Sequence, residues 1–177
     1  EQSKYKYDII SNESLFLKNS SVVNFIICAL RTLSNFEEPV YQSELLYAWH
    51  VYLKNETPQP IAYFLEKEDN PLSPLKEHGD SLKVLNLVDQ VESLIRLFRL
   101  NEEKDQVAYL LSFQDAILDF SQKENSGTDG FLLWWEDNKD RAIQVSDEME
   151  AMRLMTIHKS KGLQFKVVII PFCNWKM

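Results

Sequence analysis

Near the C-terminal end of the chain, residues 152–170 read MRLMTIHKSKGLQFKVVII. Residues 152–157 predict a strand, residues 158–162 a polar and basic loop, and residues 163–165 the end of a turn. The run at 167–170 is β-branched throughout, and a run that is apolar on both faces is typical of a buried strand in a parallel sheet. This part of the sequence therefore predicts strands near residues 152–157 and 166–171, joined by a basic loop.

Most of the preceding sequence is helical in pattern. Apolar side chains recur at helical spacing over residues 22–33 and 43–54, and again in two longer stripes: Leu85, Val88, Val91, Ile95 and Phe98, then Val107, Leu110, Leu111, Ile117 and Leu118. One strand-like segment, residues 6–11, comes before these helices. We therefore expect a mainly α fold with a small α/β part, in which an inserted helical domain (residues 36–148) interrupts one α/β domain (residues 1–35 and 149–177).

The basic loop is the candidate site. Open parallel sheets bind ligands at the carboxyl ends of their strands, and the loop follows such an end. Thr156 and His158 can donate hydrogen bonds to a phosphate, lysines can balance its charge, and Gly162 lets the backbone approach closely. From the residue types alone, an ordinary basic surface loop between two strands is an equally open interpretation.

A family resemblance favours the functional interpretation. Residues 156–165, TIHKSKGLQF, resemble motif V of the UvrD-like superfamily 1 DNA helicases, whose usual form is Thr-hydrophobic-His-x-Ser/Ala-Lys-Gly-Leu-Glu-Phe. Residues 11–17 and 131–136 resemble segments of the RecB/AddA branch that border the helical insertion of the second RecA-like domain. The resemblance implies that the flanking strands belong to an incomplete RecA-like parallel sheet of the P-loop NTPase type.

The resemblance also implies roles for six residues. The expected DNA contacts are Thr156, His158 and Lys159, and the positions expected to bind nucleotide or couple it to DNA are Lys161, Gly162 and Gln164. Where the family has a glutamate that bonds the ribose of ATP, this chain has Gln164. A neutral hydrogen bond contributes about 1 kcal/mol against roughly 1.5–3 kcal/mol when one partner is charged, so weaker ribose selectivity is expected.

The parent protein implied by the resemblance is a bacterial, cytoplasmic, ATP-dependent DNA helicase or translocase of repair and recombination, with or without a nuclease activity. It would use ATP and Mg²⁺, act on single-stranded DNA and be able to pair with a nuclease or helicase subunit. The four glycines of this chain provide no GxxxxGK[ST] spacing, and no apolar run ends in paired acids. The chain alone is therefore expected to hold no catalytic residue, to bind no cofactor and to be inactive.

The chain also reads as a piece of a longer protein. It lacks an initiator methionine, and it ends just after a strand-like run. Strands separated from their neighbours leave sheet edges unpaired, which predicts self-association of the isolated chain.

The charge of the chain supports an alternative function. The net charge is −8 and the pI is near 4.9, whereas surfaces that bind nucleic acid by bulk electrostatics are usually basic. DNA contact by this chain must then come from a few local groups. The alternative is an acidic helical module for protein interaction or regulation, which would show no DNA binding at all.

Other site classes have weaker support. Cys28 and Cys173 lie in apolar surroundings and predict buried, reduced thiols, and His50, His78 and His158 have no metal-binding spacing. Two short triplets, residues 102–104 and 137–139, match the D/E-x-K pattern of metal-dependent nucleases, but their charged surroundings indicate solvated helix ends. No run of about 18 apolar residues predicts a membrane span.

Two adjacent tryptophans allow two interpretations. Trp134 and Trp135 could stack on DNA bases, as aromatic side chains do in proteins that bind single strands. Their helical spacing beside Phe131 and Leu132 favours a role in the core of the helical part, and the acidic residues that follow would repel DNA. We therefore predict that they anchor the core.

Overall fold

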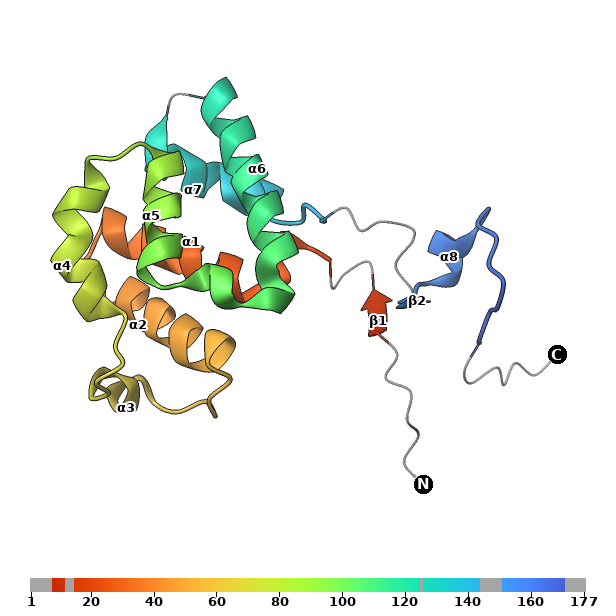
Figure 1. Cartoon of the computed structure of the whole chain (residues 1–177), viewed down its shortest axis with the longest axis horizontal. Coiled ribbons are helices and arrows are strands. Elements are labelled where there is room, and N and C mark those ends of the chain that lie inside the picture. Colours follow the sequence, from red (N-terminus) through yellow and green to blue (C-terminus); the bar gives the residue numbers. More distant parts are fainter. Residues whose placement is uncertain (1–7, 12–14, 125, 144–150, 171–177) are drawn as a thin grey trace.

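The computed structural model describes residues 8–11, 15–124, 126–143 and 151–170. It consists of a body of helices and a small strand-bearing unit beside it (Figure 1). The helical body contains α1 (Ser21–Ser34), α2 (Pro39–Tyr47), α3 (Ile61–Leu65), α4 (Leu72–Lys83), α5 (Leu87–Leu97), α6 (Val107–Lys123) and α7 (Gly127–Asn138). Its short helical turns are η1 (Leu17–Asn19), the π-helix η2 (Ala48–Leu53), η3 (Leu100–Glu102) and η4 (Lys104–Gln106), and the second unit contains β1 (Asp8–Ser11), β2 (Ala151–Leu154) and α8 (Ile157–Ser160).

Helix α1 forms the centre of the helical body. The predicted cap is confirmed, because the Ser20 side chain accepts a hydrogen bond from the Val23 amide at 3.2 Å. Nine of the fourteen residues of α1 are buried, and α2, α4, α5, α6 and α7 all pack on it. A helix that is apolar on nearly all sides must be covered on all of them, so α1 fixes where the other helices lie.

The two ends of the helical body lie side by side. Phe16 and Ala142 form an isolated antiparallel bridge, the Leu17 amide donates to the Arg141 carbonyl at 2.8 Å, and the Ile143 amide donates to the Leu15 carbonyl at 2.9 Å. These bonds close the helical body at its neck, so that the chain enters and leaves it at one place.

Beyond the neck, β1 and β2 form a two-stranded parallel sheet. Asp8 pairs with Ala151 and Ser11 with Leu154, so the two strands are in register along their whole length. The first two strands predicted from sequence are therefore present, although Lys6 and Tyr7 lie outside the described residues. Because parallel strands need a long crossover between them, the whole helical body occupies the place of that crossover.

The third predicted strand is absent. Residues 166–170 form no strand, and Val167–Ile170 are exposed in spite of their β-branched, apolar sequence. A strand needs hydrogen-bonding neighbours, and none of the described residues pairs with this run. The mainly helical character of the chain is confirmed, whereas the larger RecA-like sheet is not seen.

The predicted domain boundary at residue 36 separates α1 from the helices on which it packs. The structure continues the helical body back to Leu15, since α1 forms its core and the neck joins Leu15 to Ile143. The apolar pattern of α1 alone did not indicate its partners. The division into residues 1–35 with 149–177 and residues 36–148 therefore stays a prediction about domain membership, while packing places α1 with the later helices.

The long helices follow their predicted patterns with one difference. Helix α5 buries the predicted side chains Val91 and Ile95, and the helix predicted over 43–54 is present as α2 and the π-helix η2. In α6, only part of the predicted stripe is buried: Leu110 and Ile117 point into the core together with Phe113, Ala116 and Phe120. The remaining predicted positions of α6, Val107, Leu111 and Leu118, are exposed.

The tryptophan pair anchors the core, as predicted. Trp135 is buried and meets the ring of Phe113 edge-on at a centroid distance of 5.3 Å, and Trp134 stacks on Phe131 at 5.6 Å. The second aromatic cluster joins α1 to its neighbours, with Phe25 within 5.2 Å of Trp49 and 4.8 Å of Phe98. Edge-to-face geometry of this kind stabilises beyond burial alone.

The described cysteine is an inert core residue. Burial raises the pKa of the Cys28 thiol to about 12, so the thiol stays protonated and unreactive near neutral pH. This confirms the predicted buried, reduced thiol for Cys28, while Cys173 lies outside the described residues. Among the helices of the described residues, none has the length and apolar character needed to cross a bilayer.

An ionic network holds the loop between η2 and α3. His50 is fully buried, stacks on Phe64 at 4.7 Å, and its Nδ1 lies 3.1 Å from a carboxylate oxygen of Glu56. The other carboxylate oxygen of Glu56 accepts a hydrogen bond from Lys67. The hydrogen bonds from Lys67 and His50 hold the pKa of Glu56 below its usual value, and the bond to Glu56 raises the pKa of Lys67.

The packing of α1 predicts a large loss of stability on truncation. Leu30→Ala, which removes a fully buried side chain, is expected to lower the free energy of unfolding by about 2–5 kcal/mol. Leu133→Ala, an exposed position on α7, serves as the control and is expected to change it by less than about 0.5 kcal/mol. Urea unfolding followed by circular dichroism measures both, and similar values for the two variants would contradict the assignment of α1 as the core.

The Glu56 network predicts a pH-dependent contribution to stability. Because the folded carboxyl has the lower pKa, acid protonates the unfolded chain first, so its contribution is present above pH 4.5 and is lost as the pH falls through the folded pKa. Glu56→Gln is therefore expected to lower the Tm near neutral pH, and the difference from the native chain is expected to shrink toward about pH 3. The matched control is Glu66→Gln, and a Tm difference for Glu56→Gln that stays constant with pH would refute the network.

Candidate nucleic-acid interface

The candidate site lies directly at the carboxyl end of β2. Strand β2 ends at Leu154, and the next residues turn into the four-residue helix α8. Strand β2 is shorter than the predicted strand 152–157, and residues 157–160, which include His158 and Lys159 from the predicted basic loop, form a helical turn. We call residues 156–164 the basic turn.

Thr156 forms the start of this turn. Its backbone is extended, and its hydroxyl oxygen accepts a hydrogen bond from the Lys159 amide at 3.4 Å, which caps α8. The Thr156 carbonyl accepts from the Ser160 amide at 3.0 Å, and the Ser160 carbonyl accepts from the Leu163 amide at 3.0 Å. The capping oxygen is used as an acceptor, so the hydroxyl hydrogen of Thr156 remains able to donate to a ligand.

Gly162 reverses the chain after α8. Its φ is +86°, in the region that favours glycine, and an added Cβ would meet nothing within 4 Å. The requirement for glycine is therefore one of backbone conformation and not of space. The reversal exposes Lys161 and Gln164 on either side of it.

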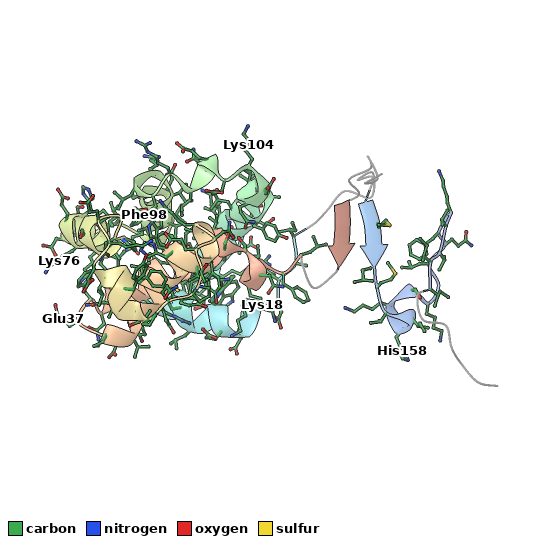
Figure 2. The ribbon with its side chains drawn as sticks, turned by 90° about the horizontal axis from the view of Figure 1, so that it is seen from below. Lys18, Glu37, Lys76, Phe98, Lys104 and His158 are labelled. Carbon is green, nitrogen blue, oxygen red and sulfur yellow. The ribbon has the colours of Figure 1, made fainter. Side chains whose placement is uncertain are left out.

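All six predicted site residues are exposed. His158 and Lys159 lie on α8, Lys161 and Gly162 follow in the reversal, and Gln164 lies beyond it without regular structure. Figure 2 shows His158 in the strand-bearing unit, away from the helical body. The structure thus brings Thr156, His158 and Lys159 together in one turn, whereas no hydrogen bond among the described residues joins Gln164 to them.

Charge divides sharply between the two parts of the molecule. Residues 151–170 contain Arg153, Lys159, Lys161 and Lys166 and no acidic residue, whereas residues 15–143 contain 21 acidic and 12 basic side chains. Within the described residues, Lys159, Lys161 and Lys166 form no ion pair. The overall charge of −8 hid this division, which a count along the sequence in blocks would have revealed. A basic turn with uncompensated cations suits an anionic ligand.

The described residues offer no metal site. They hold no group of three or more His, Cys, Asp or Glu side chains that could bind an ion. The two nuclease-like triplets lie apart on the helical body: residues 102–104 span η3 and η4, and residues 137–139 end α7, where Lys139 pairs with Glu136 at 2.7 Å. Their placement agrees with solvated helix ends.

His50, Glu56 and Lys67 form an ionic cluster that sequence reasoning did not find. The three residues lie 6 and 11 positions apart, which matches no helical or strand repeat, and the π-helix that buries His50 has no sequence signature. The buried Nε2 of His50 has no hydrogen-bond partner in the structure. The cluster lies in the helical body and is separate from the basic turn.

Two known proteins share partial similarity with the chain. RecBCD enzyme subunit RecB of Haemophilus influenzae is 30% identical over 98 residues, which is 55% of this chain and 7% of that protein. An ATP-dependent helicase/nuclease subunit of Natranaerobius thermophilus is 38% identical over 73 residues, which is 38% of this chain and 6% of that protein. No protein-family model matches the chain.

The chain spans less than a tenth of the length of either relative. Both relatives are named as subunits of helicase or recombination-type enzymes, and the partial similarity supports a RecB/AddA-like origin for this chain. At this level the similarity agrees with a piece of a DNA-repair helicase, and the roles of individual residues rest on the geometry of the basic turn.

The cap at Thr156 predicts the effect of removing its hydroxyl. Thr156→Ala removes the acceptor for the Lys159 amide and is expected to speed hydrogen exchange of that amide roughly fivefold, since a lost cap costs about 1 kcal/mol. Thr156→Ser keeps the oxygen and is expected to exchange at the native rate. Amide exchange by NMR measures both, and equal rates in all three chains would show that the hydroxyl does not cap α8.

Proposed function

We propose that this chain is part of an ATP-dependent DNA helicase or translocase of the RecB/AddA type, acting in DNA repair and recombination. The observation on which this rests is the exposed basic turn at the carboxyl end of a parallel strand, in a chain with partial similarity to helicase and nuclease subunits. Both the position and the charge of the turn suit contact with a phosphate backbone.

In this proposal the DNA contacts come from three residues of the turn. The Thr156 hydroxyl donates to a phosphate oxygen while its own oxygen keeps α8 capped. His158 and Lys159 are exposed on the same short helix and reach the same strand of DNA. Contacts of this kind position a nucleic acid without reading its sequence, as a translocating enzyme requires.

The nucleotide side of the proposal involves the residues that follow. Lys161 and Gly162 form the reversal between α8 and Gln164, so movement of a nucleotide against Gln164 is passed to α8 through two residues. In this role Gln164 bonds the ribose of ATP through a neutral amide.

ATP and Mg²⁺ are proposed for the whole enzyme and not for this chain. The sequence has no GxxxxGK[ST] loop, and the described residues form no group able to hold a divalent ion. The basic turn consists of cations and neutral groups, which do not fit Mg²⁺, an ion that prefers oxygen ligands from carboxylates. We therefore expect the chain alone to be inactive as an ATPase.

The proposal includes partners and a location. Single-stranded DNA is the substrate, the enzyme works together with a second subunit that is a nuclease or helicase, and its location is the bacterial cytoplasm. The outer edges of β1 and β2 are unpaired among the described residues, so self-association of the isolated chain remains expected, and a clean monomer by gel filtration at high concentration would contradict it.

A second candidate function concerns the helical body alone. With 21 acidic side chains against 12 basic ones over residues 15–143, this surface repels DNA and suits a docking or regulatory role. The two functions are compatible in one protein, since they use different parts of the chain.

The proposal predicts where single-stranded DNA touches the chain. Titration with an oligothymidine at low salt is expected to shift the NMR signals of residues 156–164 and to leave those of the helical body unchanged. With three phosphate contacts, the logarithm of the binding constant is expected to fall with the logarithm of salt concentration with a slope of about −2. Lys159→Glu with Lys161→Glu is expected to abolish the shifts.

Matched charge changes on the helical body provide the control. Lys83→Glu with Lys104→Glu changes the charge equally, and both residues are exposed on the helical body, so DNA binding is expected to persist. Shifts centred on the helical body, or equal loss in both double variants, would contradict the proposed contact. ATP hydrolysis by the same preparation that disappears on Lys161→Ala would contradict the expected inactivity.

A further inference from the structure

Helix α6 has two apolar faces, and only one of them is covered. Leu110, Phe113, Ile117 and Phe120 point into the core. On a second line along the helix, Val107, Leu111 and Leu118 are 38%, 58% and 43% exposed. Their spacing of four and seven residues places them in one row along the outer surface of α6. We call these three residues the outer stripe.

The outer stripe is bordered by acidic side chains. Asp115 lies four residues after Leu111 and three before Leu118, so it flanks both leucines on the helix surface. Asp105 precedes the stripe, and neither it nor Asp115 forms an ion pair within the described residues. Asp119, one turn beyond Asp115, is held by Arg141 at 2.9 Å.

Few basic side chains offset these acids. Over residues 102–123 there are five acidic residues, and the basic residues Lys104 and Lys123 stand before the helix and at its last position. The row of leucines therefore lies in a locally negative field.

From this arrangement we propose that the outer stripe of α6 is the docking surface for a basic amphipathic helix of a partner protein. The apolar face of the partner covers Val107, Leu111 and Leu118, and its lysines and arginines lie against Asp105 and Asp115. The inference deepens the docking role of the helical body and rests on that role; it does not depend on DNA contact by the basic turn.

The shape of the stripe favours a helical partner. The three side chains repeat at the spacing of a helix over about three turns, and a second helix packs its own ridges between such rows. An extended peptide would bind by adding to a sheet edge, which α6 does not offer. A second α6 would bring the same acids face to face, so like charges oppose pairing of this face with itself.

The test uses a designed peptide as the probe. It is about 18 residues long, with leucines at helical spacing on one face and lysines and arginines on the others. Two control peptides are used: one replaces the basic residues with glutamate, and one keeps the composition but shuffles the order so that no apolar face forms. Binding to the whole 177-residue chain is measured by NMR shifts and by titration calorimetry.

Variants of α6 locate the binding surface. Leu111→Gln with Leu118→Gln removes the apolar row at exposed positions, and Leu133→Gln makes the same change on α7, where Leu133 is 76% exposed. Circular dichroism and the Tm establish that all three chains are folded. We expect the basic amphipathic peptide to shift the signals of residues 107–122 and to bind the double variant roughly tenfold more weakly than the native chain or Leu133→Gln.

Several outcomes would overturn the proposal. These are no binding of the basic peptide, equal binding to the native chain and the double variant, or equal binding of the shuffled peptide, which would indicate charge alone. A dimer of the native chain that Leu111→Gln with Leu118→Gln dissociates would show that a second copy covers the stripe instead. In all of these cases DNA shifts at residues 156–164 can still be measured, so the motor proposal is judged separately.

Discussion

Helix α1 is apolar on nearly every side, and its burial organises the helical body. Val22, Phe25, Ile26, Ala29 and Leu30 are fully enclosed, and such a helix has no stable place except between others. Arg31, near the end of α1, forms ion pairs with Glu44 of α2 and Glu136 of α7, so the charged end of the helix also ties its neighbours together. The aromatic clusters on either side of α1 complete this core.

The helical body reaches the rest of the chain through its neck, and the neck explains how so many helices can lie between two paired strands. Antiparallel bonds at Phe16 and Ala142 bring the two ends of the body together, and β1 and β2 then pair in parallel just beyond them. The basic turn follows β2 directly. Its position therefore depends on the packing of the helical body only through the neck, which separates an acidic, helical part from a small basic one.

Periodicity alone predicted much of the helical body. Helix α5 and the core role of Trp135 followed from apolar spacing, because burial of one face is a local property of the sequence. Spacing did not reveal that Leu110 and Leu111 of α6 face different environments, since adjacent apolar residues do not say which of them meets the core. Nor did it predict the π-helix at His50, whose geometry comes from packing against Phe64.

At the site, sequence predicted the residues better than their conformation. The run at Val167–Ile170 has every local feature of a buried strand, yet burial and hydrogen bonds come from neighbouring strands, and none of the described residues supplies them. His158 and Lys159 were expected in a loop, and they form a helical turn because Thr156 caps it. A capping threonine is visible in sequence only when the residues after it are already known to turn.

The parallel pairing of β1 with β2 is the central claim, since it makes the helical body an insertion and places the basic turn at the end of a strand. Cysteines at positions 10 and 153, which face each other in the register, test it directly in a chain with Cys173→Ser. Facing positions lie within the range of about 4.4–6.8 Å between Cα atoms that a disulfide spans, whereas cysteines at positions 8 and 154 are three residues out of register, about 10 Å apart along the strands. We predict that Ile10→Cys with Arg153→Cys forms a disulfide readily under mild oxidation and that Asp8→Cys with Leu154→Cys does not. Equal cross-linking of the two pairs, or none in the facing pair, would contradict the parallel sheet and with it the placement of the site.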